Sequence, residues 1–476
     1  MKKAIYGLCV VILLLFGFAI YYLNGAMPIG SGYSAKYVCS QVFLAGRDPD
    51  SVFKKDVKPT NPLFLLFSNE VDYALKTVTS KALGFWCPKT AVYREGFGCT
   101  LAVDVTREEL MKQVEGDIGR QSVMDMNKPW PAGELVDLSS LPKEVDREKL
   151  NKVVEEAFNE PFDKSQRNTQ AVVIVYKDRI IAEKYAKSFS PFIPMLGWSM
   201  SKSVTSALVG ILVKAGKLNI KDTSLVASWK SHDDPRSKIT LDQLLRMSSG
   251  LEFEEVYGPF KDATYMLYDS KSMADYAAAK PLKSEPDGEW NYSSGSANII
   301  ARIVKDAVGG TLVSFNNFVR KNLFDRINIY YAVIEPDASG SFVGSSYMFA
   351  TARDWARIGL LYKNDGVWGD DRVLPAGWVK YSTTPTPKAP MGEYGAQIWL
   401  NAGEKGNSTN RKYPSLPVDL FYFSGFNEQI VAVIPSRDVV VVRLGVTHDE
   451  KSWDVEAFIR DVLDCIQTNP GSCKQL

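Results

Sequence analysis

Two side chains suited to acyl-transfer chemistry, Ser199 and Lys202, stand three residues apart in the sequence SMSK. The apolar residues that follow predict a helix over residues 200–215, so both side chains lie in or next to its first turn. Residues three apart share one helix face, with Cβ atoms about 5–6 Å apart, and the lysine amine can therefore reach the serine hydroxyl. Backbone N–H groups at a helix start stabilise an oxyanion, and a lysine withdrawn from water can accept a serine proton.

The same spacing also fits a purely structural role, with Ser199 as a helix N-cap and Lys202 as a solvated residue of the first turn. Two later segments favour the chemical role. The sequence WNYSSG of residues 290–295 precedes a helix predicted over 297–307, and FSGF of residues 423–426 leads into a predicted strand.

The order, spacing and setting of these segments resemble the serine β-lactamase and penicillin-binding-protein superfamily, with its S-x-x-K, Y-x-N and K/H-T-G motifs. Within it, the chain is most similar to the class-C-like branch that includes esterases and 6-aminohexanoate-dimer (nylon-oligomer) hydrolases. The resemblance covers roughly residues 150–465. It implies a β-lactamase/transpeptidase-like α/β (α+β) fold, an antiparallel sheet flanked by helices with an added helical lobe. Further strings that carry the resemblance are KITLDQLLRMSSGL at 238–251, EPDG at 285–288 and IPSRD at 434–438.

The resemblance also implies roles for individual residues. Ser199 resembles the acylated nucleophile and Lys202 its proton-accepting partner. Tyr292 resembles the tyrosine that passes the proton to the leaving group and later activates water. The oxyanion would be held by the backbone N–H groups of Ser199 and Phe426, and neither a metal nor a cofactor is implied.

Two departures from the family motifs bear on the substrate. Ser294 stands where many β-lactamases have an asparagine that holds the substrate's acylamide group. Phe423 stands where a lysine or histidine would bind a carboxylate, while Gly425 keeps the glycine of that motif. These changes favour a small acyl substrate, an ester or amide without an obligatory carboxylate. A cell-wall DD-peptidase or β-lactamase is the second interpretation, and a non-catalytic binding scaffold on the same fold is the third.

Composition excludes several other classes of protein. The 476 residues carry 56 Lys and Arg against 55 Asp and Glu, a net charge of +1, so there is no basic footprint for nucleic acid. The two histidines, His232 and His448, argue against a His-rich zinc site and leave little scope for a Ser-His-Asp triad. We interpret both histidines as loop or turn residues.

The N-terminus predicts a membrane helix. Lys2 and Lys3 precede the uncharged run 4–23, which is long enough to span a hydrocarbon core of about 30 Å. A cleaved signal peptide has a shorter apolar region and a small-residue cleavage site, so an anchor is favoured over a secreted product. The lysines favour a cytoplasmic N-terminus and place the catalytic domain on the extracytoplasmic (periplasmic) side of the cell membrane. The expected segments are 1–25, the transmembrane anchor or signal; 26–146, an N-terminal extension; and 147–476, the hydrolase domain.

Two hairpins and several helices are predicted to position the catalytic residues. Runs rich in β-forming residues predict one hairpin over 172–185 and another over 430–444, so that a single antiparallel sheet is built from both ends of the hydrolase domain. Amphipathic patterns predict helices over 148–158 and 454–467. In the extension, a strand-like run is expected at 63–67 and the only longer helix near 108–115.

The cysteines fit an oxidising compartment. Cys87 and Cys99 form one close pair in sequence, and Cys465 and Cys473 form another, which leaves Cys39 over. The sequence leaves the oligomeric state and the natural substrate open.

Overall fold

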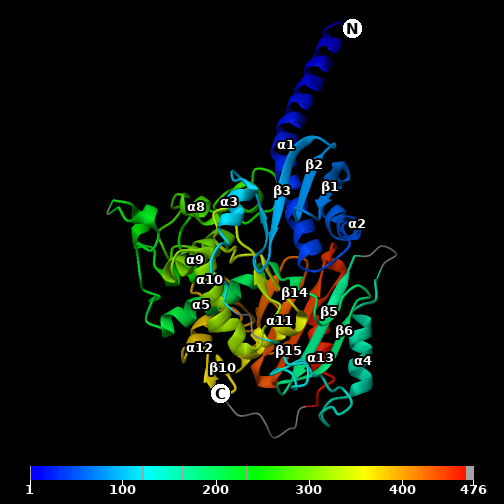
Figure 1. Cartoon of the computed structure of the whole chain (residues 1–476), viewed down its shortest axis with the longest axis vertical. Helices are drawn as coiled ribbons and strands as arrows, with labels where there is room; N and C mark the ends of the chain where they lie inside the picture. The colour runs from blue at the N-terminus through cyan, green and yellow to red at the C-terminus, as the bar shows by residue number, and fades with distance from the viewer. Residues whose placement is uncertain (1, 120–122, 162–165, 232, 468–476) are drawn as a thin grey trace.

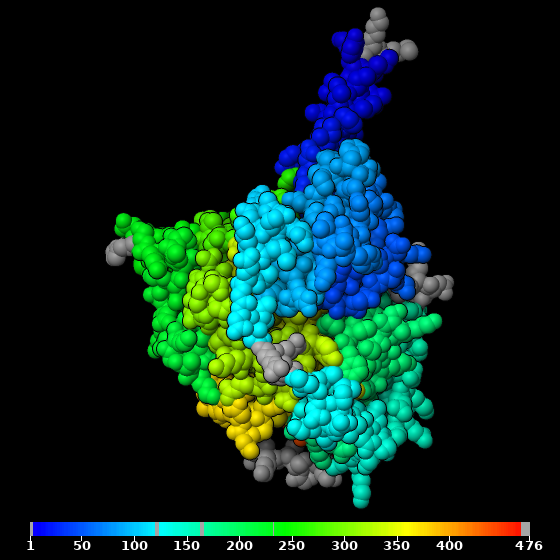
Figure 2. Space-filling model, viewed as in Figure 1, coloured from blue at the N-terminus to red at the C-terminus, as the bar shows by residue number. Residues whose placement is uncertain are grey.

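The structure is a computed structural model in which a long helix rises from a layered body. It describes residues 2–119, 123–161, 166–231 and 233–467, so the sequence interpretations of His232 and Cys473 lie outside the described residues. Helix α1 runs over Lys2–Phe43. Its first half stands clear of the body in Figures 1 and 2, and its second half enters the body beside the N-terminal strands.

The body is built on a six-stranded antiparallel sheet of order β12-β13-β14-β15-β5-β6. β15 pairs with β5 over most of their length, which joins the two ends of the hydrolase domain and confirms the predicted single sheet. The bounds are β5 Thr169–Tyr176, β6 Arg179–Tyr185, β12 Trp399–Leu400, β13 Phe421–Gly425, β14 Gln429–Ile434 and β15 Val439–Gly445.

Both faces of this sheet are buried. Alternate residues of its central strands point to opposite sides; for example, Val173 and Val175 belong to the main core, whereas Val172 and Ile174 belong to a second core. Helix α11 packs on the first face, and α4 and α13 contribute to the second core. The longer helices of the body are α4 Arg147–Glu156, α5 Ser201–Lys214, α9 Ser294–Ala307, α11 Ala352–Lys363 and α13 Val455–Leu463.

A helical lobe lies to one side of the sheet, as predicted, and α5 and α9 contact each other at its centre. The predicted helices over 148–158, 200–215, 297–307 and 454–467 are confirmed with shifts of a few residues at their ends. Smaller helices of the lobe are α6 Leu241–Leu245, α7 Asp262–Asp269, α8 Met273–Ala278 and α10 Leu312–Val319, and α12 Trp378–Ser382 lies further along the chain.

The N-terminal extension has its own four-stranded sheet, packed against the second half of α1. The strand expected at 63–67 is wrong, because Pro62–Leu66 form a 3₁₀ helix and the strand begins at Phe67. The short helix expected near 108–115 is confirmed as α3 Arg107–Lys112, which a capping box at Thr106 initiates. The strands are β1 Phe67–Asp72, β2 Thr77–Ala82, β3 Trp86–Arg94 and β4 Gly98–Leu101.

The continuation of α1 beyond the apolar run was not predicted. The glycines and proline of residues 24–32 are usual helix breakers, and no helix is predicted there from the sequence. In the structure they mark close packing. A Cβ at Gly30 would lie 2.5 Å from the Phe67 ring, and one at Gly32 would lie 2.7 Å from the Tyr268 carbonyl oxygen. The boundary expected at residue 25 consequently falls inside one continuous helix.

The disulfide also differs from the expected pairing. Cys39 of α1 is bonded to Cys99 of β4, with Cα atoms 6.1 Å apart, so the Cys87–Cys99 pair suggested by sequence proximity does not form. Pairing by proximity in sequence failed because β4 packs on α1 and brings together residues 60 apart. Cys87 is a free thiol, and Cys465 is free among the described residues, whereas its expected partner Cys473 lies beyond them.

A buried carboxylate fixes α1 to the body. Glu335, which follows β8 (Val333–Ile334), is fully buried and forms an ion pair with Lys36 of α1. It also accepts hydrogen bonds from the Ser40 hydroxyl at 2.9 Å and from the Cys99 backbone N–H at 2.6 Å. Burial raises the pKa of Glu335, and the Lys36 ammonium opposes that rise. Helix, extension and body therefore meet at one carboxyl group.

Removing this carboxylate should be costly only while Lys36 remains. We expect Glu335→Leu to lower the free energy of unfolding by about 3–5 kcal/mol, because it leaves a buried cation unpaired. The double variant Lys36→Met/Glu335→Leu should recover most of that loss. Guanidinium unfolding of the detergent-solubilised protein, followed by tryptophan fluorescence, measures both, and a double variant as unstable as the single one would contradict the assignment.

Candidate active site

Ser199 lies in a strained turn between a short strand and α5. Strand β7 (Met195–Leu196) ends just before it, and a 3₁₀ turn over Trp198–Met200 leads into the helix. Trp198 has φ +48°, a left-handed conformation that costs a bulky residue free energy and that occurs mostly at functional sites. The Ser201 hydroxyl holds the turn by donating to the Trp198 carbonyl at 2.6 Å.

Two glycines let other segments approach the nucleophile turn closely. A Cβ at Gly425 would lie 2.2 Å from the Gly197 carbonyl oxygen. The end of β13 can therefore approach this turn so closely only because residue 425 is a glycine. A Cβ at Gly197 would lie equally close, 2.2 Å, to the Trp355 ring of α11. The Gln429 side chain bridges strand and turn by donating to the Leu196 carbonyl at 2.9 Å. The backbone of Gly425 therefore lies directly against the nucleophile turn.

Lys202 is almost completely buried, with 1% of its surface exposed, and points at the nucleophile. Its Nζ donates to the Ser199 hydroxyl at 2.9 Å, to the Ser294 hydroxyl at 3.0 Å and to the Ser345 carbonyl at 3.1 Å. An ammonium has three N–H groups, and each of them has an acceptor here. The predicted reach of Lys202 to Ser199 is present in the structure.

Tyr292 lies against the same lysine. The Lys202 Nζ is 4.8 Å from the centroid of the Tyr292 ring, and the tyrosine stands directly before Ser293, the N-cap of α9. Tyr394 and Trp399 pack around the ring, with centroid distances of 5.6 and 5.1 Å, and fix its orientation. Ser199, Lys202 and Tyr292, distant in sequence, thus meet at the ends of two helices.

Glu255 belongs to this cluster and was missed in the sequence. It accepts a hydrogen bond from the Ser294 hydroxyl and another from the Ser294 backbone N–H at 2.7 Å. Ser294 therefore links the Lys202 ammonium to a carboxylate instead of facing the substrate as an asparagine would. The acidic segment LEFEEV at 251–256, with three glutamates between apolar residues, carries no signal that singles out Glu255.

Tyr257 is the outermost member of a hydrogen-bonded chain that runs from Lys202 through Ser294 and Glu255. Its hydroxyl donates to Glu255 at 3.1 Å, and half of its side chain is exposed. Enclosure of the hydroxyl within the site, together with the negative charge of Glu255, raises the pKa of Tyr257 well above its usual range. This tyrosine therefore remains a neutral hydrogen-bond donor and is a poor acceptor for the Ser199 proton.

Of the third motif, FSGF at residues 423–426, the Phe423 side chain lies away from the site. Phe423 is fully buried and packs on Tyr362 of α11, with centroids 5.2 Å apart, so its side chain does not line the pocket as expected. Strand alternation turns it to the core face of β13. Phe426 is half exposed and packs edge-on against Trp198 at 5.8 Å. Its role as an oxyanion donor stays a prediction.

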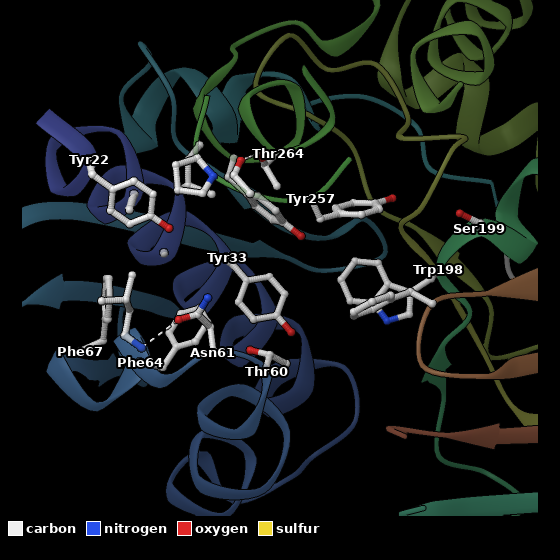
Figure 3. A pocket seen from close by; sticks show the side chains of 18 residues that line it. Tyr22, Tyr33, Thr60, Asn61, Phe64, Phe67, Trp198, Ser199, Tyr257 and Thr264 are labelled. Carbon is white, nitrogen blue, oxygen red and sulfur yellow. Dashed lines mark hydrogen bonds between the residues drawn. The ribbon is translucent and has the colours of Figure 1, made fainter. Parts of the chain in front are cut away.

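A cavity of about 210 Å³ opens beside Ser199. Its walls come from α1, residues 60–67 and residues 257–268, together with Trp198, Ser199 and Phe426. Figure 3 shows Ser199 and Tyr22 at opposite sides of the view, with Trp198 and Tyr33 between them. The rings of Tyr33 and Trp198 are stacked with centroids 6.4 Å apart. The N-terminal helix, which sequence reasoning assigned to tethering, therefore supplies a wall of the cavity.

Other titratable groups do not form a second centre of this kind. His448 contacts the Lys55 carbonyl through Nε2 at 2.9 Å and is not among the cavity residues. Within the described ranges, no cluster of three or more His, Cys, Asp or Glu side chains is arranged to hold a metal ion.

Known hydrolases resemble the chain in sequence and in fold. It is 24% identical over 299 residues to the 6-aminohexanoate-dimer hydrolase of Paenarthrobacter ureafaciens, a match over 58% of this chain and 72% of that protein. EstCE1, a hydrolase with promiscuous acyltransferase activity, matches with a TM-score of 0.52 at 15% identity, over 67% of this chain and 97% of that structure. A penicillin-binding protein homologue from Caulobacter crescentus matches with a TM-score of 0.51 at 14% identity, over 69% and 99% of the two chains.

The two structural matches establish the fold, and the family follows from the sequence. Residues 154–457 match the family described as Beta-lactamase. This region contains the nucleophile turn, Lys202, Tyr292 and the sheet that positions them. Because the match extends over more than half of the chain, the protein belongs to the β-lactamase family.

Proposed function

We propose that the protein is a serine hydrolase that cleaves ester or amide substrates through an acyl-enzyme on Ser199. The observation that carries this proposal is the 2.9 Å hydrogen bond between the Lys202 Nζ and the Ser199 Oγ, formed by a buried lysine beside Tyr292. A surface lysine would not need such an environment, whereas a base for a serine hydroxyl does.

The geometry supports a two-step reaction. The Ser199 Oγ attacks the acyl carbonyl carbon, and its proton passes to the Lys202 and Tyr292 pair. Collapse of the tetrahedral intermediate breaks the bond to the leaving group, which takes that proton and departs as an alcohol or amine. Water then attacks the acyl-enzyme, gives one proton back through the same pair, and releases a carboxylic acid and free Ser199.

Ester or small-amide chemistry is favoured over cell-wall chemistry. Phe423 is turned into the core, so the cation that would bind a carboxylate is absent at this motif position. The hydroxyl of Ser294 is engaged by Lys202 and Glu255 and has no amide to offer a peptide substrate. The related 6-aminohexanoate-dimer hydrolase and EstCE1 are named for amide and acyl-transfer chemistry, which agrees with this choice.

We further propose that α1 anchors the protein in the membrane, with the catalytic body on the extracytoplasmic side. The helix contains an apolar window of mean hydropathy 2.5, none of which is buried in the body. Beyond this window the same helix packs into the body and carries the Cys39–Cys99 disulfide. Cleavage near residue 25 would cut a continuous helix, so a mature protein lacking these residues would contradict the anchor.

The nucleophile is tested by covalent labelling. Wild-type protein should form a fluorophosphonate adduct, detected as a mass increase, that Ser199→Ala abolishes and Ser249→Ala keeps. A stable adduct with fluorescent penicillin would instead favour a penicillin-binding enzyme. Absence of any adduct would favour the non-catalytic scaffold.

The role of Tyr292 is tested by removing one oxygen. Tyr292→Phe keeps the ring between Tyr394 and Trp399 and should lower turnover of a reactive ester by about 10²-fold or more, the scale of general acid–base catalysis. Tyr394→Phe, in the same aromatic cluster, should leave turnover close to wild type. Near-normal turnover in Tyr292→Phe would refute its assignment.

Glu255 is a positioning residue that acts through Ser294 on Lys202. Glu255→Gln should lower kcat by about tenfold to a hundredfold, because the Ser294 hydroxyl loses its charged acceptor. Glu254→Gln is the matched control, because Glu254 is exposed and pairs with Lys261. A wild-type kcat in Glu255→Gln would contradict this role.

A further inference from the structure

The cavity beside Ser199 follows α1 toward the apolar end of that helix. Tyr22, Ala26, Ile29 and Tyr33 line it from α1 at spacings of four, three and four residues, so they share one helix face. The eleven steps along the helix from Tyr22 to Tyr33 cover about 16 Å at a rise of ~1.5 Å per residue. Tyr22 ends the exposed apolar run, whereas Tyr33 stacks on Trp198, the neighbour of the nucleophile. The cavity therefore extends from the proposed membrane span to the reacting serine, as Figure 3 shows.

The cavity wall is apolar along its length. Among the described residues that line it, none is Asp, Glu, Lys or Arg, so a charged group inside would have no partner. The polar side chains of the wall are hydroxyls and one amide, which leaves room for an ester or amide linkage near Ser199. Hydrocarbon is the chemistry that this wall accommodates. The side chains contributed by the extension and the lobe are Thr60, Asn61, Leu63, Phe64, Phe67, Tyr257, Thr264 and Tyr268.

Exposed apolar side chains lie on the part of the extension from which the membrane helix leaves. Leu66 and Leu83 are 41% and 53% exposed, and their backbones are joined by a hydrogen bond of 2.8 Å. Phe85, in the same β2–β3 turn, is 77% exposed. Phe260 is 53% exposed and stacks on Tyr21 of the apolar run, with centroids 4.8 Å apart. Large exposed apolar residues gathered beside a membrane helix indicate contact with the lipid interface.

We propose that the substrate is a long-chain acyl ester or amide of the lipid bilayer, whose acyl chain enters the cavity along α1. This inference rests on the proposed acyl-enzyme at Ser199. The acyl chain occupies the wall from Tyr22 to Tyr33, and its carbonyl reaches the Ser199 hydroxyl. Attack by the serine breaks the bond to the head-group alcohol or amine, which leaves with the serine proton. Water then releases the long-chain carboxylic acid.

A chain-length series with a blocked cavity tests the proposal. The full-length protein in phosphatidylcholine vesicles is assayed with butanoyl and dodecanoyl esters of one chromogenic alcohol. Wild type should prefer the dodecanoyl ester. Ala26→Phe places a ring in the cavity and should lower the ratio of kcat/KM for the dodecanoyl ester to kcat/KM for the butanoyl ester on the order of tenfold or more. Ala19→Phe adds the same ring on the same helix, outside the cavity, and should change neither value.

Photocrosslinking gives a second readout that needs no turnover. Ser199→Ala protein is placed in vesicles that contain phosphatidylcholine with a diazirine on one acyl chain. After illumination, mass spectrometry should find cross-links on residues around Tyr33 and Phe64, and Ala26→Phe should reduce them. Cross-links confined to the apolar run before Tyr22 would overturn the proposal. Cross-linking by a soluble diazirine fatty ester, but not by the vesicle lipid, would overturn the bilayer as the source.

The outcomes separate this inference from the proposed function. Fluorophosphonate labelling of Ser199 with no preference for the dodecanoyl ester would overturn the lipid substrate and leave the serine hydrolase in place. Equal loss of both esters in Ala26→Phe, with labelling of Ser199 retained, would also overturn it. Absence of labelling together with absence of ester hydrolysis would remove both proposals.

Discussion

The active site is organised by the need to satisfy the side-chain nitrogen of a buried lysine. Lys202 has almost no contact with water, so each of its N–H groups must find an acceptor within the protein. The acceptors come from the nucleophile turn, the start of α9 and the backbone at Ser345. These three segments are separated in sequence, and the lysine holds them at fixed positions around one atom. Tyr292 directly precedes the N-cap of α9, and Glu255 binds Ser294 at the start of that helix. The contact between Lys202 and Ser294 therefore also brings these two residues to the site.

The central chemistry could be predicted from the sequence because it depends on short segments at helix starts. Ser199 and Lys202 are related by helix geometry alone, and Tyr292 stands at the start of another helix. Glu255 could not be found in this way, because its role depends on a loop folding back onto Ser294. Residues whose positions are set by tertiary contacts, and not by local geometry, give little signal in one sequence.

The same distinction explains what was missed in the fold. Nearly continuous hydrophobic runs predicted the central sheet, because a strand buried on both faces is apolar along most of its length. The continuation of α1 was hidden, because Gly30 and Gly32 serve helix packing and look like breakers in isolation. The Cys39–Cys99 disulfide follows from that packing, so an error about the helix led directly to an error about the pairing. Phe423 was misplaced because a motif position does not specify which face of a strand it occupies.

The unbroken course of α1 from its exposed apolar half into the core has a mechanical consequence. A flexible tether would let an enzyme sample a broad volume around its attachment point. With α1 as the proposed anchor, a continuous helix bonded at Cys39 and held by Glu335 permits no such excursion, and the Ser199 hydroxyl would stay at nearly one height above the membrane surface. The height of Ser199, as well as the shape of the pocket, would then limit the substrates. An ester or amide bond held far above this height could not reach the serine, whatever its chemistry.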